Sequence, residues 1–268
     1  MLEAIANTYA NGIIPDIMTR VSGNFAVAFL VLGVILCALI GYVFGSFNFA
    51  LILSKKMYGD DIRTHGSKNA GTTNMMRTYG KKAAFLTILG DILKAVFAVA
   101  IGCFAMGISL GGYVAGLFCV LGHVFPIFYG FRGGKGVATA AAVILMLNPV
   151  VFLAVIAVFV IVVIFSRYVS LGSVLAAAVF PLLTYYSLFG SENLIPHKGF
   201  SFLASFIMAL TVILKHRTNL SRLAHGTESK FAFKKSAEEK NKDEINNAEH
   251  IYTAKKVKKQ TKFKARKK

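Results

Sequence analysis

Residues 111–147 read GGYVAGLFCVLGHVFPIFYGFRGGKGVATAAAVILML, two apolar runs joined by a short polar loop. The loop carries the cations Arg132 and Lys135. It also contains three closely spaced glycines, Gly133, Gly134 and Gly136. Because glycine has no Cβ, this backbone can take a positive φ and approach an anion closely. A turn without a ligand needs no pair of cations at a membrane boundary, so the pattern predicts a phosphate-handling site at the edge of a bilayer.

The composition of the whole chain indicates a membrane protein. The chain is 56% hydrophobic with a mean hydropathy of +0.62, yet it has a formal net charge of +18. These values conflict in a soluble domain and agree in a membrane protein with a basic cytoplasmic side. A high isoelectric point also occurs in nucleic-acid-binding proteins. Here the basic residues lie mostly in loops and in the tail, so we expect no nucleic-acid partner.

The chain contains seven apolar segments, and a membrane-spanning helix needs about 20 such residues. The segments are residues 25–53, 83–106, 111–128, 137–147, 150–165, 171–189 and 200–214. The fourth stops at Asn148-Pro149, where proline disfavours a continuing helix. The fourth and fifth segments are therefore either two spans or one bent hairpin. The sequence predicts an all-α polytopic membrane protein with about seven transmembrane helices.

The charges of the loops predict the orientation of these helices. With seven crossings, the basic loop 54–82, the glycine-rich loop, Arg167 and the basic tail fall on one side of the membrane. The loops 107–112 and 148–149 fall on the other side and carry no charge, and the third loop there, 190–199, carries Lys198 and Glu192. By the positive-inside rule, the N-terminus is outside and the C-terminus is cytoplasmic.

Three parts of the chain are expected. Residues 1–24 form an extracytoplasmic segment, residues 25–229 form a seven-helix membrane domain, and residues 230–268 form a basic, disordered cytoplasmic tail. The block 255–268 is able to contact anionic lipid head groups, with about 1 kcal/mol from each basic residue near the surface. The stretch 216–228, which leaves the last apolar segment, is expected to be a juxtamembrane basic helix.

A polar loop earlier in the chain, at residues 61–82 (the first polar loop), has chemistry similar to that of the glycine-rich loop. Its hydroxyl, amide and basic side chains are Ser67, Asn69, Thr72, Thr73, Asn74, Arg77 and Lys81. Such groups are hydrogen-bond donors for a phosphate or a developing oxyanion. The alternative is a solvated, turn-rich loop. That alternative is weaker because two loops of similar chemistry lie on the same side.

Other polar residues lie within or beside the spans. Asp91 and Lys94 share a helix face, and ionisable residues inside a span usually face the bundle interior in pairs. The pair is either structural or a support for the site. His123 is either structural or orients a substrate. Ser170 and Ser173 could add donors to the same site.

Taken together and in order, these clusters resemble the bacterial integral-membrane acyl-phosphate:glycerol-3-phosphate acyltransferase family (PlsY type), over about residues 43–228. The matching positions include Gly45, Ser46, Asp61, Arg63, Gly66, Ser67, Asn69, Gly71, Thr73, Asn74, Arg77, Lys81, Asp91, Lys94, Gly122, His123, Pro126, Gly133–Thr139, Arg167, Ser170, Ser173, His216, Asn219, Arg222 and Glu228. Lys68 departs from the pattern, because the family usually has glycine there. The lysine either adds affinity for phosphate or points to water.

The resemblance implies transfer of a fatty acyl group from acyl phosphate to the 1-hydroxyl of sn-glycerol 3-phosphate. The products are lysophosphatidate and phosphate, in the first acylation step of phospholipid synthesis. The implied catalytic residues are Ser67, Arg77 and Lys135. The implied substrate-binding residues are Asn69, Gly71, Thr73, Asn74, Lys81, His123, Gly133, Gly134, Gly136, Ser170, Ser173, His216 and Asn219.

The implied setting is the plasma membrane, with the active site on its cytoplasmic face. Its partners are the two substrates and the bilayer. No cofactor is expected, and no acidic or His/Cys cluster in the sequence offers a metal ligand set.

No His-x4-Asp pair occurs among the six histidines, so the histidine/aspartate machinery of acyl-CoA-dependent enzymes is not indicated. Our hypothesis is that the acyl phosphate itself accepts the proton of the alcohol. The protein then supplies position and electrostatic stabilisation, and His216 and Asn219 orient glycerol 3-phosphate.

Two other classes of function compete with the enzyme. A transporter of an organic phosphate would use the same loops as a gate. Transporters place their sites near the bilayer midplane, whereas polar residues here gather on one side. A membrane scaffold that acts through its basic tail leaves the glycine-lysine loop unexplained.

Overall fold

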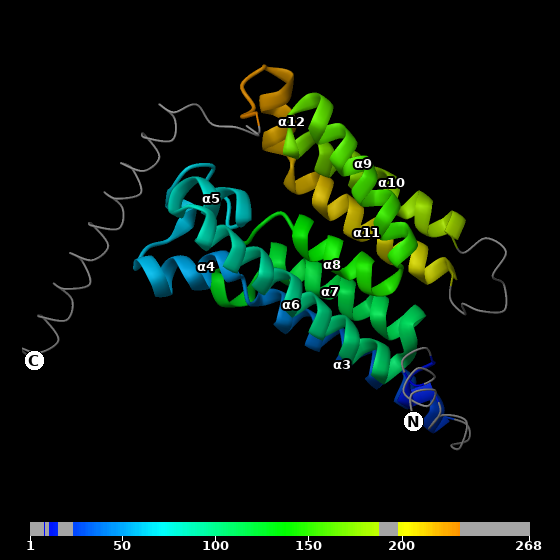
Figure 1. Ribbon diagram of the computed structural model, residues 1–268. Helices are drawn as coiled ribbons and strands as arrows, with labels where there is room; N and C mark the ends of the chain where they lie inside the picture. Colours follow the sequence, from blue (N-terminus) through cyan, green and yellow to red (C-terminus); the bar gives the residue numbers. More distant parts are fainter. Residues whose placement is uncertain (1–7, 9–10, 16–23, 188–197, 231–268) are drawn as a thin grey trace, which may run out of the picture.

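The structure of the protein is a computed structural model that describes residue 8 and residues 11–15, 24–187 and 198–230 (Figure 1). All regular structure in these residues is helical. The helices are α3 (Asn24–Ser46), α4 (Phe49–Leu53), α5 (Thr72–Tyr79), α6 (Lys81–Met106), α7 (Tyr113–Val124), α8 (Val137–Leu147), α9 (Pro149–Ser166), α10 (Val169–Ser187), α11 (Lys198–Lys215) and α12 (Arg217–Ala224). The predicted tail from residue 231 onward and most of the predicted segment 1–24 lie outside the described residues. The all-α prediction is confirmed for the described residues.

The first apolar segment is broken rather than continuous. Helix α3 ends at Ser46, and Asn48 then caps α4 by accepting a hydrogen bond from the Leu51 amide at 3.1 Å. Amide and hydroxyl side chains are favoured at this position because they satisfy the free backbone amides of a helix start. The break turns the chain toward the polar loop that follows, by way of a short π-helix, Ser54–Tyr58.

Glycines allow α3 to pack closely on α7. A Cβ at Gly41 would overlap the carbonyl of Ala115, and one at Gly45 would overlap the carbonyl of Cys119. Small residues let membrane helices approach to backbone contact, where van der Waals packing replaces the hydrophobic effect. This contact holds the broken first segment against α7, which leads into the glycine-rich loop.

Helices α6 and α7 form an antiparallel pair. The chain turns at Gly107, whose φ is 76°, and continues through a π-helical turn, Gly107–Gly112. Gly102 and Gly111 then face each other so closely that a Cβ on either would overlap the carbonyl of the other. The main core lies between this pair and α8, α10 and α11. In Figure 1, α9, α10 and α11 lie side by side along the other flank, and α10 packs against both α9 and α11.

Four segments of the described chain are long and apolar enough to cross a membrane: 25–58, 81–129, 149–166 and 169–187. The bent pair α11 and α12 would make a fifth, and α8, with 11 residues, is shorter. Each of the seven predicted apolar segments contains a helix within its described residues. The structure supports four to five spans by length, so seven crossings and the sides of the two termini remain predictions.

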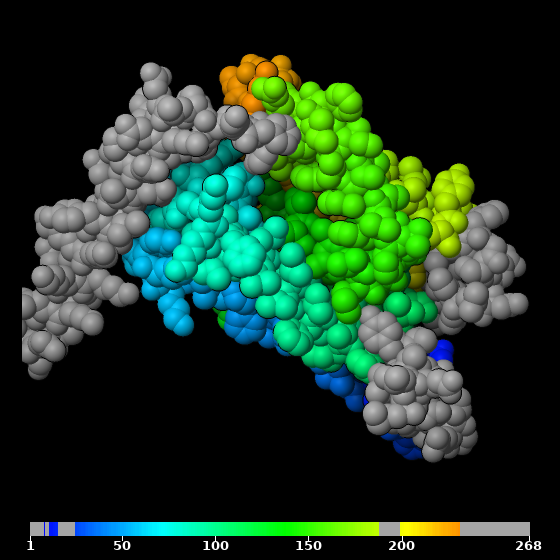
Figure 2. Space-filling view, viewed as in Figure 1, coloured from blue at the N-terminus to red at the C-terminus, as the bar shows by residue number. Residues whose placement is uncertain are grey.

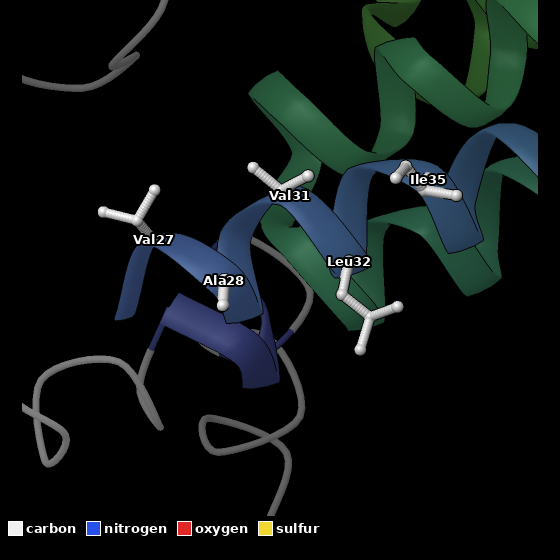
Figure 3. A pocket seen from close by; sticks show the side chains of 5 residues that line it. All are labelled: Val27, Ala28, Val31, Leu32 and Ile35. Carbon is white, nitrogen blue, oxygen red and sulfur yellow. The ribbon is translucent and has the colours of Figure 1, made fainter. Parts of the chain in front are cut away.

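The outward face of α3 is apolar. Figure 3 shows Val27, Ala28, Val31, Leu32 and Ile35 along this helix, where they line a shallow hollow. Val27 is 61% exposed and Leu32 is 52% exposed. Apolar side chains on the outside of a helix of spanning length suit contact with lipid chains.

Candidate active site

The first polar loop is held in shape by one buried amide, Asn74 on α5. Its Nδ2 donates hydrogen bonds to the carbonyls of Ile62, His65 and Asn69 at 3.0–3.1 Å, and its Oδ1 accepts from the Ser67 amide at 3.0 Å. Buried polar groups that are fully paired fix a single backbone arrangement. The hydrogen bonds of the Asn74 side chain therefore go to the backbone of the loop itself.

The tip of this loop contains a lysine in the left-handed region. Lys68 has φ of 57°, and its amide donates to the carbonyl of His65 at 2.9 Å. Gly66 before it has φ of 52°, and a Cβ there would overlap Oδ1 of Asn74. Ser67 and Lys68 are exposed, and Asn69 is partly buried. The turn thus presents three polar side chains in succession.

Arg63 ties the first loop to the glycine-rich loop. Its Nη1 donates to the carbonyls of Tyr129 and Arg132, at 2.9 and 3.0 Å, and its Nη2 pairs with Asp61 at 2.7 Å. The hydrogen bond from Arg63 lowers the pKa of Asp61, although burial acts in the opposite direction. A guanidinium has enough donors in a fixed fork for such a bridge.

The glycine-rich loop folds back over the end of α7. The Gly133 amide donates to the carbonyl of Val124, and the Gly134 amide donates to that of His123, both at 3.2 Å. A Cβ at Gly133 would overlap the His123 carbonyl, and one at Gly134 would overlap the His123 ring. The absence of side chains therefore serves close packing on α7 at these two glycines. Gly136, with φ of 82°, starts α8.

A buried ion-pair network lies beneath both loops. Lys94 Nζ lies 2.8 Å from Asp91 Oδ1 and donates to the carbonyls of Gly45 and Phe47, at 3.1 and 3.0 Å, and to His123 Nδ1 at 2.8 Å. The two carbonyls belong to the broken end of α3, where helical partners are missing. The structure places Asp91, Lys94 and His123 in a support for the loops.

Helices α11 and α12 meet at an angle of 52° beside the two loops. At the joint, buried His216 donates from Nδ1 to the carbonyl of Val212 at 2.8 Å. One turn later, Asn219 accepts from Lys135 Nζ through Oδ1 and donates from Nδ2 to Glu228 at 2.6 Å. Arg222 also donates to Glu228 at 2.7 Å. A chain of polar contacts therefore links the glycine-rich loop to α12.

A cleft of about 500 Å³ lies between these three parts of the chain. Its lining residues are Ser67, Lys68, Asn69, Phe125, Gly133, Gly134, Lys135, Thr211, Leu214, Lys215, Arg217, Thr218, Asn219 and Arg222. Figure 2 shows the surface hollowed between the cyan part that contains α5 and the green part that contains α9. Five of the lining residues are lysine or arginine and none is acidic, so the cleft suits an anion.

Lys135 is held in the cleft by a hydrogen bond from its Nζ to Asn219 Oδ1. Burial lowers its pKa to about 8; Glu228 acts in the opposite direction, and nearby Arg222 and Arg77 lower it further. For Glu228, burial raises the pKa, but hydrogen bonds from Asn219, Arg222 and Ser170 outweigh it and the pKa is lowered. Lys135 remains mostly protonated at neutral pH, because its pKa still lies above 7.

The structure brings together residues that the sequence placed in separate motifs. The predicted site residues that line the cleft are Ser67, Asn69, Gly133, Gly134, Lys135 and Asn219. Those outside its lining are Gly71, Thr73, Asn74, Arg77, Lys81, His123, Gly136, Ser170, Ser173 and His216. Among these, Arg77 is near enough to influence Lys135, and Ser173 donates to the carbonyl of Val169 within α10 at 2.8 Å.

Several lining residues were not predicted as site residues: Lys215, Arg217, Thr218 and Arg222. Glu228, which pairs with two neighbours of Lys135, was not predicted either. The stretch 216–228 was interpreted as a juxtamembrane helix, and only His216 and Asn219 within it were predicted as substrate-binding residues. A signal was present, because Arg217 and Arg222 lie near His216 and Asn219 in sequence. Among the described residues, no group of three or more His, Cys, Asp or Glu is placed to hold a metal ion.

The fold and the cleft define a helical membrane protein with a cationic site between its polar loops. The family model described as Glycerol-3-phosphate acyltransferase matches residues 35–226. A glycerol-3-phosphate acyltransferase of Clostridioides difficile is 44% identical over 206 residues, which cover 75% of this chain and 97% of that relative. One of Trichlorobacter lovleyi is 44% identical over 192 residues, which cover 71% and 93%.

Two solved structures are also similar. The glycerol 3-phosphate form of PlsY (YgiH), an integral membrane glycerol 3-phosphate acyltransferase, has a TM-score of 0.65 at 34% identity and covers 74% of this chain and 96% of that one. The lysophosphatidic acid form has a TM-score of 0.64 at 33% identity, with coverage of 74% and 95%. The chain belongs to the glycerol-3-phosphate acyltransferase family of the PlsY type.

Proposed function

We propose that this protein transfers a fatty acyl group from acyl phosphate to the 1-hydroxyl of sn-glycerol 3-phosphate. The products are 1-acyl-glycerol 3-phosphate and inorganic phosphate. The observation that carries the proposal is the cleft with five lysine or arginine side chains between two glycine-rich loops and the α11–α12 joint. Both substrates bear a phosphate, and cations with backbone amides are the usual partners of phosphate groups.

The chemistry requires one proton transfer. The 1-hydroxyl oxygen attacks the acyl carbonyl carbon, the carbonyl carbon–oxygen bond to phosphate breaks, and the departing phosphate takes the hydroxyl proton. In the proposal, Ser67, Arg77 and Lys135 hold the phosphate and stabilise the negative charge that develops on the carbonyl oxygen. The rate acceleration comes from holding the two substrates together and from the fixed dipoles and charges of the site.

The other predicted residues have supporting roles in this proposal. His216 and Asn219 orient glycerol 3-phosphate, and Asn219 does so while bonded to Lys135 and Glu228. Asn74 and His123 act on the substrates through the loops that they hold. The remaining substrate-binding positions are proposed as predicted: Asn69, Gly71, Thr73, Lys81, Gly133, Gly134, Gly136, Ser170 and Ser173.

The proposed setting is the plasma membrane, with the cleft facing the cytoplasm. The basic residues around the cleft support this orientation, because cytoplasmic loops carry an excess of lysine and arginine. A cytoplasmic opening also suits a water-soluble acceptor such as glycerol 3-phosphate. The acyl chain of the donor would lie toward the apolar helices.

The choice of donor is tested with purified protein in detergent, given glycerol 3-phosphate and either palmitoyl phosphate or palmitoyl-CoA. Lysophosphatidate is expected from palmitoyl phosphate alone. Product formed only from palmitoyl-CoA would refute the proposed donor. No product from either donor, with transport of glycerol 3-phosphate in proteoliposomes, would favour the transporter.

The site assignment is tested by Arg77→Ala and Lys135→Ala, with Lys56→Ala as the control. Lys56 is an exposed lysine in the turn Ser54–Tyr58 and does not line the cleft. We expect turnover to fall at least tenfold in the first two variants, as when a charged stabilising group is lost, and to stay unchanged in the control. Folded variants of Arg77 or Lys135 with wild-type turnover would contradict the assignment.

A further inference from the structure

Lys68 has a strained backbone conformation that the packing of its side chain does not offset. Its φ of 57° lies in the left-handed region, which is unfavourable for a residue with a Cβ and costs glycine little. Its side chain is exposed, so burial does not offset the strain. The backbone there is fixed by the hydrogen bond from the Lys68 amide to the carbonyl of His65 and by the hydrogen bond from the Asn74 side chain to the same carbonyl.

Lys68 lies on the wall of the cleft, which suggests a functional reason for its strained backbone. The cleft wall formed by the first loop consists of Ser67, Lys68 and Asn69, and Lys68 is its only charged member. The opposite wall carries Lys135 and the cations of α11 and α12. Strained residues that persist in a well-determined loop are found preferentially at functional sites.

Lys68 also has no carboxylate to neutralise it among the described residues. The described ion pairs in this region join Arg63 to Asp61, His65 to Asp60 and Arg222 to Glu228. An unpaired ammonium on the wall of a cationic cleft raises the repulsion within the empty site. An anion of charge −2 relieves that repulsion when it enters.

We propose that Lys68 is a substrate-binding residue that contacts a phosphate group from the first-loop side of the cleft and increases its affinity. This inference rests on the proposed function, because the phosphate belongs to either glycerol 3-phosphate or the acyl phosphate. Lys68 lines the first-loop wall of the cleft, where the substrate would otherwise meet only Ser67 and Asn69.

The test uses Lys68→Gly, which removes the charge and suits the existing backbone. The variant is expected to unfold at a temperature equal to or above that of the wild type, because the strain is released. Its KM for one phosphorylated substrate is expected to rise roughly three- to tenfold, the effect of losing one charged contact. Lys68→Arg, which keeps both the charge and the strain, should retain a KM near that of the wild type.

Separate titrations of glycerol 3-phosphate and of palmitoyl phosphate show which phosphate the residue contacts. Lys56→Gln is the control, because it removes the same charge outside the cleft. A wild-type KM for both substrates in Lys68→Gly would overturn the inference, as would an equal KM rise in Lys56→Gln. A rise that shrinks at high salt supports a charge contact.

Failure of the two proposals can be told apart. A wild-type protein without turnover would refute the proposed reaction. The inference is then decided by calorimetric binding of glycerol 3-phosphate and of inorganic phosphate. Weaker binding to Lys68→Gly than to the wild type supports it, and equal binding overturns it.

Discussion

Replacement of Lys94 by methionine tests the buried network directly. Methionine has a similar length and an apolar end, so the change removes the ammonium with little change in volume. Lys94 is 4% exposed and Asp91 is 1% exposed, and their charged atoms are 2.8 Å apart. The variant leaves the buried Asp91 carboxylate without its lysine partner, with only His123 Nδ1 at 3.5 Å, and leaves the carbonyls of Gly45 and Phe47 without this donor.

The expected cost follows from these contacts. Removing one partner of a buried ion pair costs about 3–5 kcal/mol. The lost bonds to two carbonyls, at about 0.5–1.5 kcal/mol each, place Lys94→Met toward the upper end of that range. For a domain of this size, 1 kcal/mol lowers the Tm by about 2–4 °C. The melting temperature should therefore fall by roughly 10–20 °C.

Unfolding can be followed with a thiol-reactive dye in detergent, because Cys37, Cys103 and Cys119 are buried free cysteines. The double variant Asp91→Asn with Lys94→Met is the control, since it removes the unpaired charge as well. It should recover part of the lost stability. A single variant within about 2 °C of the wild type, or a double variant no more stable than the single one, would refute the reasoning.

Two further predictions concern the cleft. Lys135 is charged below its pKa of about 8, so the affinity for glycerol 3-phosphate should fall as the pH rises through about 8. The test is the KM for glycerol 3-phosphate, measured from about pH 6.5 to 9.5 in the wild type and in Lys135→Arg, which stays charged. An equal rise of KM at alkaline pH in both proteins would contradict the prediction. Gly134→Ala would place a Cβ on the His123 ring and 2.6 Å from the Ala70 carbonyl, so turnover should fall at least tenfold. The control is Gly199→Ala, which has nothing within 4 Å of an added Cβ and should behave as the wild type. Equal activity of the two alanine variants would show that close packing at Gly134 is not needed.

The helical segments could be predicted from sequence because they depend on local apolar composition. Helices α6 and α9 begin and end within two residues of the predicted segments 83–106 and 150–165. The break of the first segment after Ser46 was not predicted. It depends on Lys94, almost 50 positions later, which supplies donors to the freed carbonyls. Contacts between residues so distant in sequence leave no periodic signal.

The site was predictable in its loops and at Asn219, and not in the cations that α11 and α12 contribute. Glycines and cations in the two loops indicated a phosphate site, and six of the predicted residues line the cleft. The basic residues of α11 and α12 follow an apolar segment, a pattern that is also typical of juxtamembrane helices. In the structure, α12 bends by 52° from α11, and Arg217 and Arg222 line the same cleft as Lys135. The left-handed backbone of Lys68 likewise follows from the hydrogen bonds of Asn74, which sequence alone does not reveal.

The most direct test of the central claim is the stoichiometry of the reaction in purified, folded protein. Phosphate and lysophosphatidate are measured in the same sample, with palmitoyl phosphate present and glycerol 3-phosphate either present or absent. Acyl transfer in the cleft predicts equal amounts of the two products and release that depends on glycerol 3-phosphate. Phosphate released without lysophosphatidate, or at the same rate without the acceptor, would contradict it.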